Sequence, residues 1–437
     1  MLSDPIAALA TPPGRSALAV VRLAGTGAFE IAARVVADFR PDPRRATLGT
    51  FLDSTGQPID RGIYIVFPAP HSFSGDDTVE FSCHGGLTAP SRLLAALHAA
   101  GARPAAPGEF TRRALMNGKM DLLQAEAVGD LVDATAPAQA RAALAQLEGN
   151  LSRRIGRLRE ALVEVEALLA YEIDFPGEDD GPVAPERISA ALERAATDTD
   201  RLLATAPLGE RLRDGALVVI AGRPNAGKSS LFNALLGTER AIVTEIAGTT
   251  RDAIEAHLSF LDWPVRLVDT AGIRDTADRV EAMGVEVSRR WLAAADLVLL
   301  CVESGVERSA QERDLLATYP ALEVRTKSDL VPMRGGVSVV TGEGLDQLRA
   351  QVAERLFGAQ VRLADLEPGL TRERHRVALA QAVDELRAAR PFLGRDGDAT
   401  LASHHVRRAI LALDELIGAV DVEEVLGRVF GSFCIGK

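Results

Sequence analysis

The sequence predicts a multidomain protein: an α+β N-terminal domain, a discontinuous α-helical domain, and an α/β domain of the P-loop, Ras-like type inserted into the helical one. The first observation is length, because 437 residues suffice for about three domains with separate cores. The second is a pattern that changes from short β-like runs to helical spacing, then to alternating strands and helices, and back to helical spacing. These changes place the domain segments at 1–118, 119–212, 213–362 and 363–437.

Composition narrows the class of protein. Charged residues at 25% and apolar residues at 47% are ordinary for a globular protein. The net charge of −12 argues against a protein that binds nucleic acid with its whole surface, although a local basic patch is allowed. Cys83, Cys301 and Cys434 are scattered, which fits a reducing compartment. Without a signal peptide pattern or a membrane-length apolar run, we expect a soluble cytoplasmic protein with no membrane association.

The first segment carries β-like runs at 17–23, 62–67 and 78–83, with helical stretches between them such as 89–100. Proline and glycine separate these runs, which is typical of an α+β unit.

Helical spacing then dominates from 122 to 171, where apolar residues recur at three and four positions and predict a long helical segment. The acidic stretch 174–182 predicts a loop, and 185–205 predicts a further helix. Helical spacing returns at 363–430, so the two helical stretches can pack on each other.

Between them, apolar strands are expected at 216–221, 265–268, 296–302 and 322–325, with a helix at 229–236. Repeated strand and helix units of this kind predict a parallel sheet with helices on both faces.

A phosphate-binding loop is predicted at Gly222-Arg-Pro-Asn-Ala-Gly-Lys-Ser229, between a strand and a helix. Its glycines let backbone N–H groups turn toward phosphates, and the helix N-terminus adds its positive dipole end. Lys228 is expected to reach the β and γ phosphates, and the Ser229 hydroxyl to bind Mg²⁺.

Four further motifs follow in the order of a GTP site. Gly248-Thr-Thr-Arg-Asp252 offers a threonine hydroxyl to Mg²⁺. In Asp269-Thr-Ala-Gly272, the carboxylate can hold the metal and the Gly272 N–H can sense the γ-phosphate. In Thr326-Lys-Ser-Asp329, the aspartate can accept from guanine N1 and N2, a donor pair that adenine lacks, while the Lys327 stem covers the base. Ser338-Val-Val-Thr-Gly-Glu-Gly344 would contact guanine O6 through backbone N–H groups. Ile273 stands where many GTPases place a water-orienting glutamine, so another group must place the water.

The whole chain resembles the family of the tRNA modification GTPase MnmE, also called TrmE. Besides the GTP motifs, the resemblance rests on three N-terminal motifs and the end of the chain: Ala10-Thr-Pro-Pro-Gly-Arg15, Cys83-His-Gly-Gly86, Asn117-Gly-Lys-Met-Asp-Leu-Leu-Gln-Ala-Glu126 and Phe433-Cys-Ile-Gly-Lys437. It implies a GTP hydrolase acting in tRNA modification, a homodimer formed through the N-terminal domain, and a FAD-dependent partner, MnmG (GidA). Together they would install a carboxymethylaminomethyl-type group at C5 of the wobble uridine of certain tRNAs.

The resemblance also implies site residues. Asn225, Lys228 and Glu281 would act in catalysis, with Glu281 orienting the water. K⁺ would be bound by Asn225, Thr244, Ile246 and Thr249 as the two G domains meet, and Mg²⁺ by Ser229 and Thr250. With the motifs, it assigns the GTP contacts to Asn225, Ala226, Gly227, Lys228, Ser229, Ser230, Thr244, Glu245, Ile246, Ala247, Gly248, Thr249, Thr250, Asp269, Thr270, Ala271, Gly272, Thr326, Lys327, Asp329, Ser338 and Val339.

A second ligand, a formyl-tetrahydrofolate, is implied for the N-terminal domain at Arg22, Glu80, Lys119 and Lys437. Cations suit the glutamate tail of a folate, and a carboxylate suits the donor edge of the pterin. The chain has only four lysines, Lys119, Lys228, Lys327 and Lys437, and all four fall on expected ligand sites. Cys434 is open to two interpretations, a nucleophile or a packing residue.

Two residues depart from the family pattern: Thr326 replaces an asparagine and Val339 an alanine. We expect guanine specificity to survive with weaker affinity, because Asp329 remains. Two alternative functions stay open, a regulatory GTPase switch in ribosome assembly and a folate-dependent one-carbon transferase with a regulatory G domain. For tRNA phosphates, the candidate arginines lie at 153–159 and 372–376, although such runs are more often solvated helix faces.

Overall fold

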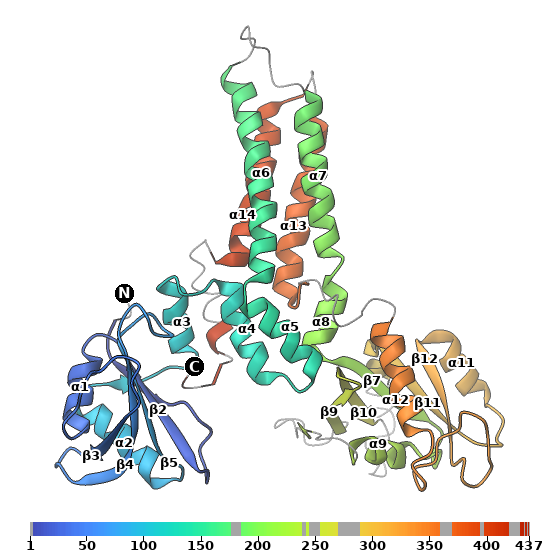
Figure 1. Cartoon of the computed structure of the whole chain (residues 1–437). Coiled ribbons are helices and arrows are strands. Elements are labelled where there is room, and N and C mark those ends of the chain that lie inside the picture. Colours follow the sequence, from blue (N-terminus) through green and yellow to red (C-terminus); the bar gives the residue numbers. More distant parts are fainter. Residues whose placement is uncertain are drawn as a thin grey trace, which may run out of the picture. The chain divides into compact units, whose positions relative to one another are not determined.

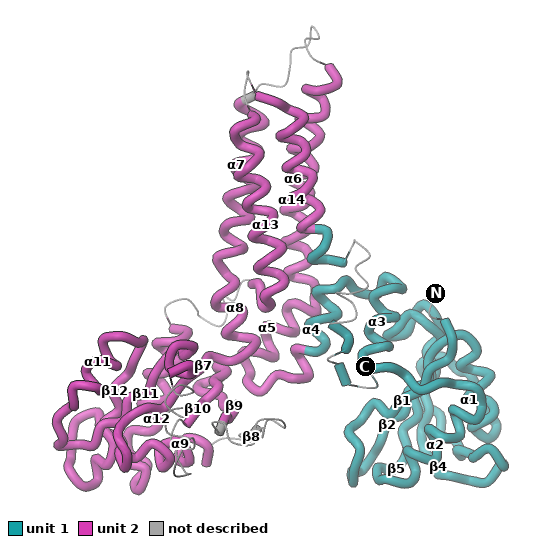
Figure 2. Tube along the Cα trace, turned by 180° about the vertical axis from the view of Figure 1, so that it is seen from behind, with its two compact units in different colours: residues 1–129, 414–437 teal, residues 130–413 magenta. Residues whose placement is uncertain are grey.

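The structure is a computed structural model that describes residues 3–175, 185–237, 242–243, 254–269, 289–358, 369–393, 397–418, 429–431, 433–434 and 436. The chain forms two compact units, one of residues 1–129 with 414–437 and one of residues 130–413 (Figure 2).

The first unit is built on a six-stranded sheet (Figure 1). Its strands are β1 Ile6–Leu9, β2 Leu18–Ala24, β3 Thr47–Leu52, β4 Pro58–Phe67, β5 Thr78–His84 and β6 Arg103–Pro104. Their order is β3-β4-β5-β2-β1-β6, and every neighbouring pair is antiparallel except β1 with β6. Because side chains alternate between faces, Val21, Leu23 and Phe81 are buried, while Arg22 and Glu80 share the opposite face.

Helices complete this unit. They are α1 Ala28–Val35, α2 Thr88–Ala99, α3 Glu109–Met116 and most of α4 Leu122–Asp133. α1 and α2 cover the buried face of the sheet, where Phe51 and Phe81 meet edge to face at 5.7 Å between ring centroids. On the opposite face Ile6, Ala8 and Ala24 pack with Phe110 of α3, and Arg22 and Glu80 lie partly buried on the same face.

The second unit contains a helical part and an α/β part. The helices are α5 Pro137–Leu147, α6 Asn150–Asp174, α7 Pro185–Leu203, α8 Ala206–Asp214, α13 Glu373–Ala389 and α14 Ala399–Ile417, whose last residues belong to the first unit. α6, α7, α13 and α14 lie side by side in both views (Figures 1 and 2). Ion pairs join helices that precede the α/β part to helices that follow it, such as Arg387 with Asp200 and Arg407 with Glu166. The prediction of a discontinuous helical domain is confirmed.

The α/β part is a second six-stranded sheet in the order β12-β11-β7-β10-β9-β8. The strands are β7 Ala216–Gly222, β8 Ile242–Val243, β9 Ile254–Phe260, β10 Trp263–Asp269, β11 Leu297–Glu303 and β12 Ala321–Thr326, and the helices are α9 Lys228–Leu236, α11 Ala310–Thr318 and α12 Leu345–Ala353. Val218 and Ile220 pack with residues of α9 and α12, whereas Leu217 and Val219 pack with residues of α11. Helices therefore cover both faces, as predicted, and strands β12, β11, β7 and β10 are parallel.

Two expectations need correction. The long helical segment 122–171 is three helices, because Ala136 is extended before Pro137 and Gly149 is left-handed at φ 80°. The sheet of the α/β part is mixed, since β9 pairs antiparallel with both β10 and β8. The alternation of apolar and polar residues from Ile254 to Phe260 is the sequence signal for strand β9.

Candidate functional site

The phosphate-binding loop has a backbone that the sequence dictates. Gly222 ends β7 at φ 142°, and a Cβ there would lie 2.4 Å from the Cys301 carbonyl oxygen, so only glycine fits beside β11. Asn225 and Gly227 are left-handed, at φ 62° and 84°, and α9 begins at Lys228. The loop therefore presents the positive end of a nine-residue helix, a binding site for anions.

Chemical groups for a nucleotide gather at this loop. Lys228 is 9% exposed, and its Nζ donates to the Arg223 carbonyl at 2.7 Å. Asp269 ends β10 in register with Ile220 of β7, which places its buried carboxylate at the same sheet edge as the loop. Ser229 and Ser230 lie exposed in the first turn of α9.

Thr326 ties the base motif to the phosphate loop. Its buried hydroxyl lies 2.8 Å from the Ala226 carbonyl oxygen, to which it donates, and 3.4 Å from that of Val302. The threonine thus makes the loop-to-loop bond for which the missing asparagine was expected.

The remaining base-recognition residues are held by an ion pair and a hydrogen bond. Lys327 is left-handed at φ 56°, and its Nζ contacts Glu303 Oε2 at 2.9 Å. The Ser338 hydroxyl donates to Asp329 Oδ1 at 2.8 Å, which orients that carboxylate. Val339 is 36% exposed, so its larger side chain is accommodated at the surface.

An ion pair anchors the phosphate loop from outside. Arg223 Nε donates to Glu312 Oε1 at 2.7 Å, and Arg223 Nη2 to the Glu307 carbonyl at 2.7 Å. Burial acts to raise the pKa of Glu312, but the hydrogen bonds from Arg223 and the Ser309 backbone outweigh it and lower that pKa. The sequence signal for Glu312 was the capping box that it forms with Ser309 at the start of α11. Arg223 lay inside the loop motif, and its role was not predicted.

The N-terminal unit holds a second cluster of charge. The Arg22 guanidinium contacts Glu80 Oε1 at 2.7 Å and the Gly436 carbonyl at 3.3 Å. The rings of Phe73 and Phe110 lie 5.6 and 5.4 Å from it, a pair of cation–π contacts that the sequence did not predict. This cluster combines a cation, a carboxylate and aromatic surface.

Lys119 contacts a loop that contributes to this cluster. Its Nζ donates to the Pro70 carbonyl at 2.9 Å, on the loop that carries Phe73. Asn117 donates to the Ser74 carbonyl of the same loop at 2.8 Å.

The cysteines differ in accessibility. Burial raises the pKa of Cys83 to about 11, with a further effect from Asp60, and burial raises that of Cys301 to about 12. Neither is a nucleophile at neutral pH. Cys434 is exposed.

The other predicted site residues lie outside the described residues: Thr244, Glu245, Ile246, Ala247, Gly248, Thr249, Thr250, Thr270, Ala271, Gly272, Glu281 and Lys437. Two of the candidate arginines for tRNA phosphates form ion pairs within the protein, Arg372 with Asp130 and Arg376 with Glu210. Among the helices of the described ranges, none is long and apolar enough to cross a membrane.

Comparison with known proteins gives matches over the whole chain. The family model of the MnmE helical domain matches residues 122–434, and that of the N-terminus of the GTP-binding protein TrmE matches residues 5–119. Two relatives bear the name tRNA modification GTPase MnmE: one of Phenylobacterium zucineum (strain HLK1), 43% identical, and one of Moorella thermoacetica (strain ATCC 39073 / JCM 9320), 41% identical, each covering 100% of both chains. Among solved structures, the G domain of the T. maritima FeoB iron transporter is 27% identical and covers 32% of this chain and 98% of its own, with a TM-score of 0.26.

Proposed function

The chain belongs to the family of the tRNA modification GTPase MnmE, also called TrmE, and is a GTP hydrolase; we propose that its GTPase cycle serves the modification of tRNA. In this proposal it acts with the FAD-dependent partner MnmG to install a carboxymethylaminomethyl-type group at C5 of the wobble uridine. The observation that carries the proposal is the presence, in one chain, of a phosphate loop joined to a guanine motif and of the Arg22 cluster in a separate unit.

The chain's own residues support GTP as the nucleotide. In this proposal Lys228, which donates to the Arg223 carbonyl, would leave it and contact the β and γ phosphates. Asp329, oriented by Ser338, accepts the guanine N1 and N2 donors. Mg²⁺ at the Ser229 and Thr250 hydroxyls would neutralise phosphate charge, and the exposed Ser229 at the start of α9 is a hard oxygen ligand suited to it.

For hydrolysis we propose that Glu281 orients the attacking water in place of the glutamine that Ile273 replaces. K⁺ at Asn225, Thr244, Ile246 and Thr249 would stabilise charge between the β and γ phosphates as the G domains of two subunits meet. The left-handed Asn225 in the phosphate loop is an oxygen donor suited to that ion. GTP hydrolysis should be faster in K⁺ than in Na⁺ at equal ionic strength, whereas equal rates would remove K⁺ from the mechanism.

For the second ligand, we propose a one-carbon folate such as 5-formyl-tetrahydrofolate at Arg22, Glu80, Lys119 and Lys437, in a homodimer formed by the N-terminal unit. The donor set fits, because Glu80 can accept from the pterin edge, the cations suit the carboxylates of the tail, and Phe73 and Phe110 add ring surface.

The partner requirement is tested by mass spectrometry of nucleosides from tRNA incubated with GTP and the folate, with and without the flavoprotein. We expect the modified uridine only in the complete mixture. Modification by this chain alone would instead identify a folate-dependent transferase. No modification in either mixture would favour a regulatory GTPase.

A further inference from the structure

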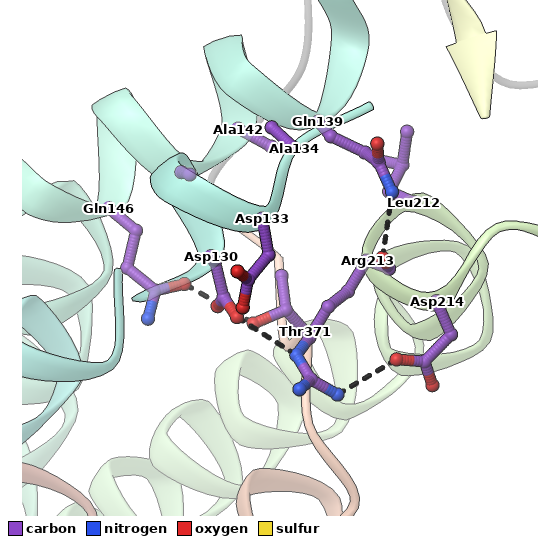
Figure 3. A pocket seen from close by; sticks show the side chains of 11 residues that line it. Asp130, Asp133, Ala134, Gln139, Ala142, Gln146, Leu212, Arg213, Asp214 and Thr371 are labelled. Carbon is purple, nitrogen blue, oxygen red and sulfur yellow. Dashed lines mark hydrogen bonds and ion pairs between the residues drawn. The ribbon is translucent and has the colours of Figure 1, made fainter. Parts of the chain in front are cut away.

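A surface pocket of the second unit is lined by the end of α4, by α5, by the end of α8 and by Thr371, which lies just before α13 (Figure 3). Asp130 is at its centre. Its Oδ1 accepts from Arg213 Nε at 3.0 Å and from Arg372 Nη2 at 2.6 Å, and its side chain is 14% exposed. One partly buried carboxylate is thus shared by two guanidinium groups.

These two arginines mark the two chain connections of the GTPase domain. Arg213 is the second-last residue of α8, which leads through Gly215 into β7 and so to the phosphate loop. Arg372 caps α13, where the chain has returned from the GTPase domain to the helices. Asp130 itself follows Gly129, the residue at which the chain passes from the first unit to the second. The incoming and the outgoing connection therefore converge on one side chain.

Neighbouring hydrogen bonds also hold the two chain connections. Gln139 Nε2 donates to the Arg213 carbonyl at 2.8 Å, while its Oε1 accepts from the Ala136 backbone N–H at 2.9 Å. The outgoing segment is held likewise, because Thr371 Oγ1 lies 3.3 Å from Gln146 Oε1. A Cβ on Gly209 would lie 1.9 Å from the Leu370 carbonyl oxygen, so glycine lets this segment pack directly on α8.

The helices are also bonded to the sheet that carries the nucleotide residues. Arg211 Nε donates to Asp296 at 2.7 Å, and the same carboxylate accepts from the Leu217 N–H of β7 at 2.9 Å. The Ala138 N–H of α5 donates to the Asp262 carbonyl, in the turn before β10, at 3.0 Å. β7 ends at the phosphate loop and β10 ends at Asp269, so these bonds connect strands of the nucleotide site to α5 and α8, two helices of the junction.

We propose that Asp130 is a positioning residue that couples the nucleotide state of the GTPase domain to the helices, by fixing both chain connections of that domain at one point. Its output, tRNA modification per GTP hydrolysed, rests on the proposed function. Asp130 lies outside the residues proposed for GTP and for the folate, so we expect its loss to leave GTP hydrolysis in place and to break the transmission.

The test is amide hydrogen exchange of the full-length protein with GDP and with a non-hydrolysable GTP analogue. In Asp130→Asn we expect exchange in peptide 369–376 to accelerate about tenfold and its difference between the two nucleotides to disappear. Asp133→Asn is the matched control, because Asp133 lines the same pocket on the same helix and makes no ion pair among the described residues. Asp133→Asn should behave as the wild-type protein in this measurement. Arg372→Gln removes only the ion pair of the outgoing connection. If Asp130→Asn folds poorly, this second variant tests the proposal, and we expect it to lose the same nucleotide-dependent difference in exchange.

Functional readouts accompany this measurement. The rate of GTP hydrolysis by Asp130→Asn should stay within about twofold of the wild-type rate, while the amount of modified uridine formed per GTP hydrolysed falls about tenfold. An unchanged nucleotide-dependent difference in both Asp130→Asn and Arg372→Gln, or an equal loss in Asp133→Asn, would overturn the proposal. The wild-type protein and its flavoprotein could modify no tRNA while Asp130→Asn still loses the difference in hydrogen exchange between the two nucleotides. In that case the proposed function fails and the coupling stands.

Discussion

Thr326→Val isolates the bond between the base motif and the phosphate loop. Valine keeps the shape of threonine but has no hydroxyl, so the Ala226 carbonyl loses the donor that lies at 2.8 Å. Thr326 is 3% exposed and Ala226 5%, so water does not readily replace that donor. A neutral hydrogen bond contributes about 1 kcal/mol, and an unsatisfied buried group costs about 1–3 kcal/mol, so we expect a loss of about 1–2 kcal/mol.

This loss should appear in nucleotide binding. Without the bond the loop spends less time in the competent conformation, and apparent affinity falls in proportion to that fraction. A loss of about 1–2 kcal/mol weakens GDP binding by about 5- to 30-fold. Discrimination between GDP and ADP should persist, because Ser338 still orients Asp329.

The assay is a fluorescence titration of the full-length protein with labelled GDP, with GDP and ADP as competitors. Thr318→Val is the control, since Thr318 is exposed at the end of α11 in the same domain. Unchanged GDP affinity in Thr326→Val, with a correctly folded protein, would refute the reasoning that Thr326 replaces the asparagine.

Three further predictions address other contacts. Glu312→Gln keeps the capping box but removes the charge facing Arg223, so GDP affinity should fall about two- to fivefold. Arg308→Gln, which breaks the ion pair with Glu323 instead, should not change GDP affinity. Equal affinities of the two variants would exclude a role of Glu312 as the anchor of the loop. Lys119→Arg should weaken 5-formyl-tetrahydrofolate binding about tenfold in a titration despite the retained charge, and unchanged affinity would remove the point-charge requirement. The pKa of Glu109 is held below its ordinary value, because hydrogen bonds from neighbouring arginines outweigh the burial that would raise it. This carboxylate therefore stabilises the fold above about pH 4.3 and loses that effect as pH falls through its folded-state pKa, so thermal unfolding of Glu109→Gln should depend less on pH between 6 and 3; an identical slope would contradict this.

The parts of the fold that follow from local patterns were predictable. β7, the glycine loop and α9 follow from an apolar run, left-handed glycine positions and a helix start, all visible in 216–236. The break between α5 and α6 depends on the single left-handed Gly149 within strong helical spacing, which masks it. Pairing between distant segments has no local signal, so the mixed order of the second sheet could not be read from the chain.

The same distinction holds for the sites. Motif spacing indicated Lys228, Asp269 and Asp329, because the chemistry requires those residue types in that order. Partners such as Glu303 for Lys327 come from other strands and belong to no motif. Phe110 beside Arg22 likewise depends on the packing of α3. Such supporting residues become visible only in three dimensions.

The central claim is that GTP hydrolysis at this phosphate loop drives tRNA modification. The most direct measurement compares modified uridine formed by the full-length protein and its flavoprotein with GTP and with a non-hydrolysable GTP analogue, using nucleoside mass spectrometry. The account predicts modification with GTP and none above background with the analogue. Equal modification with both nucleotides would contradict it.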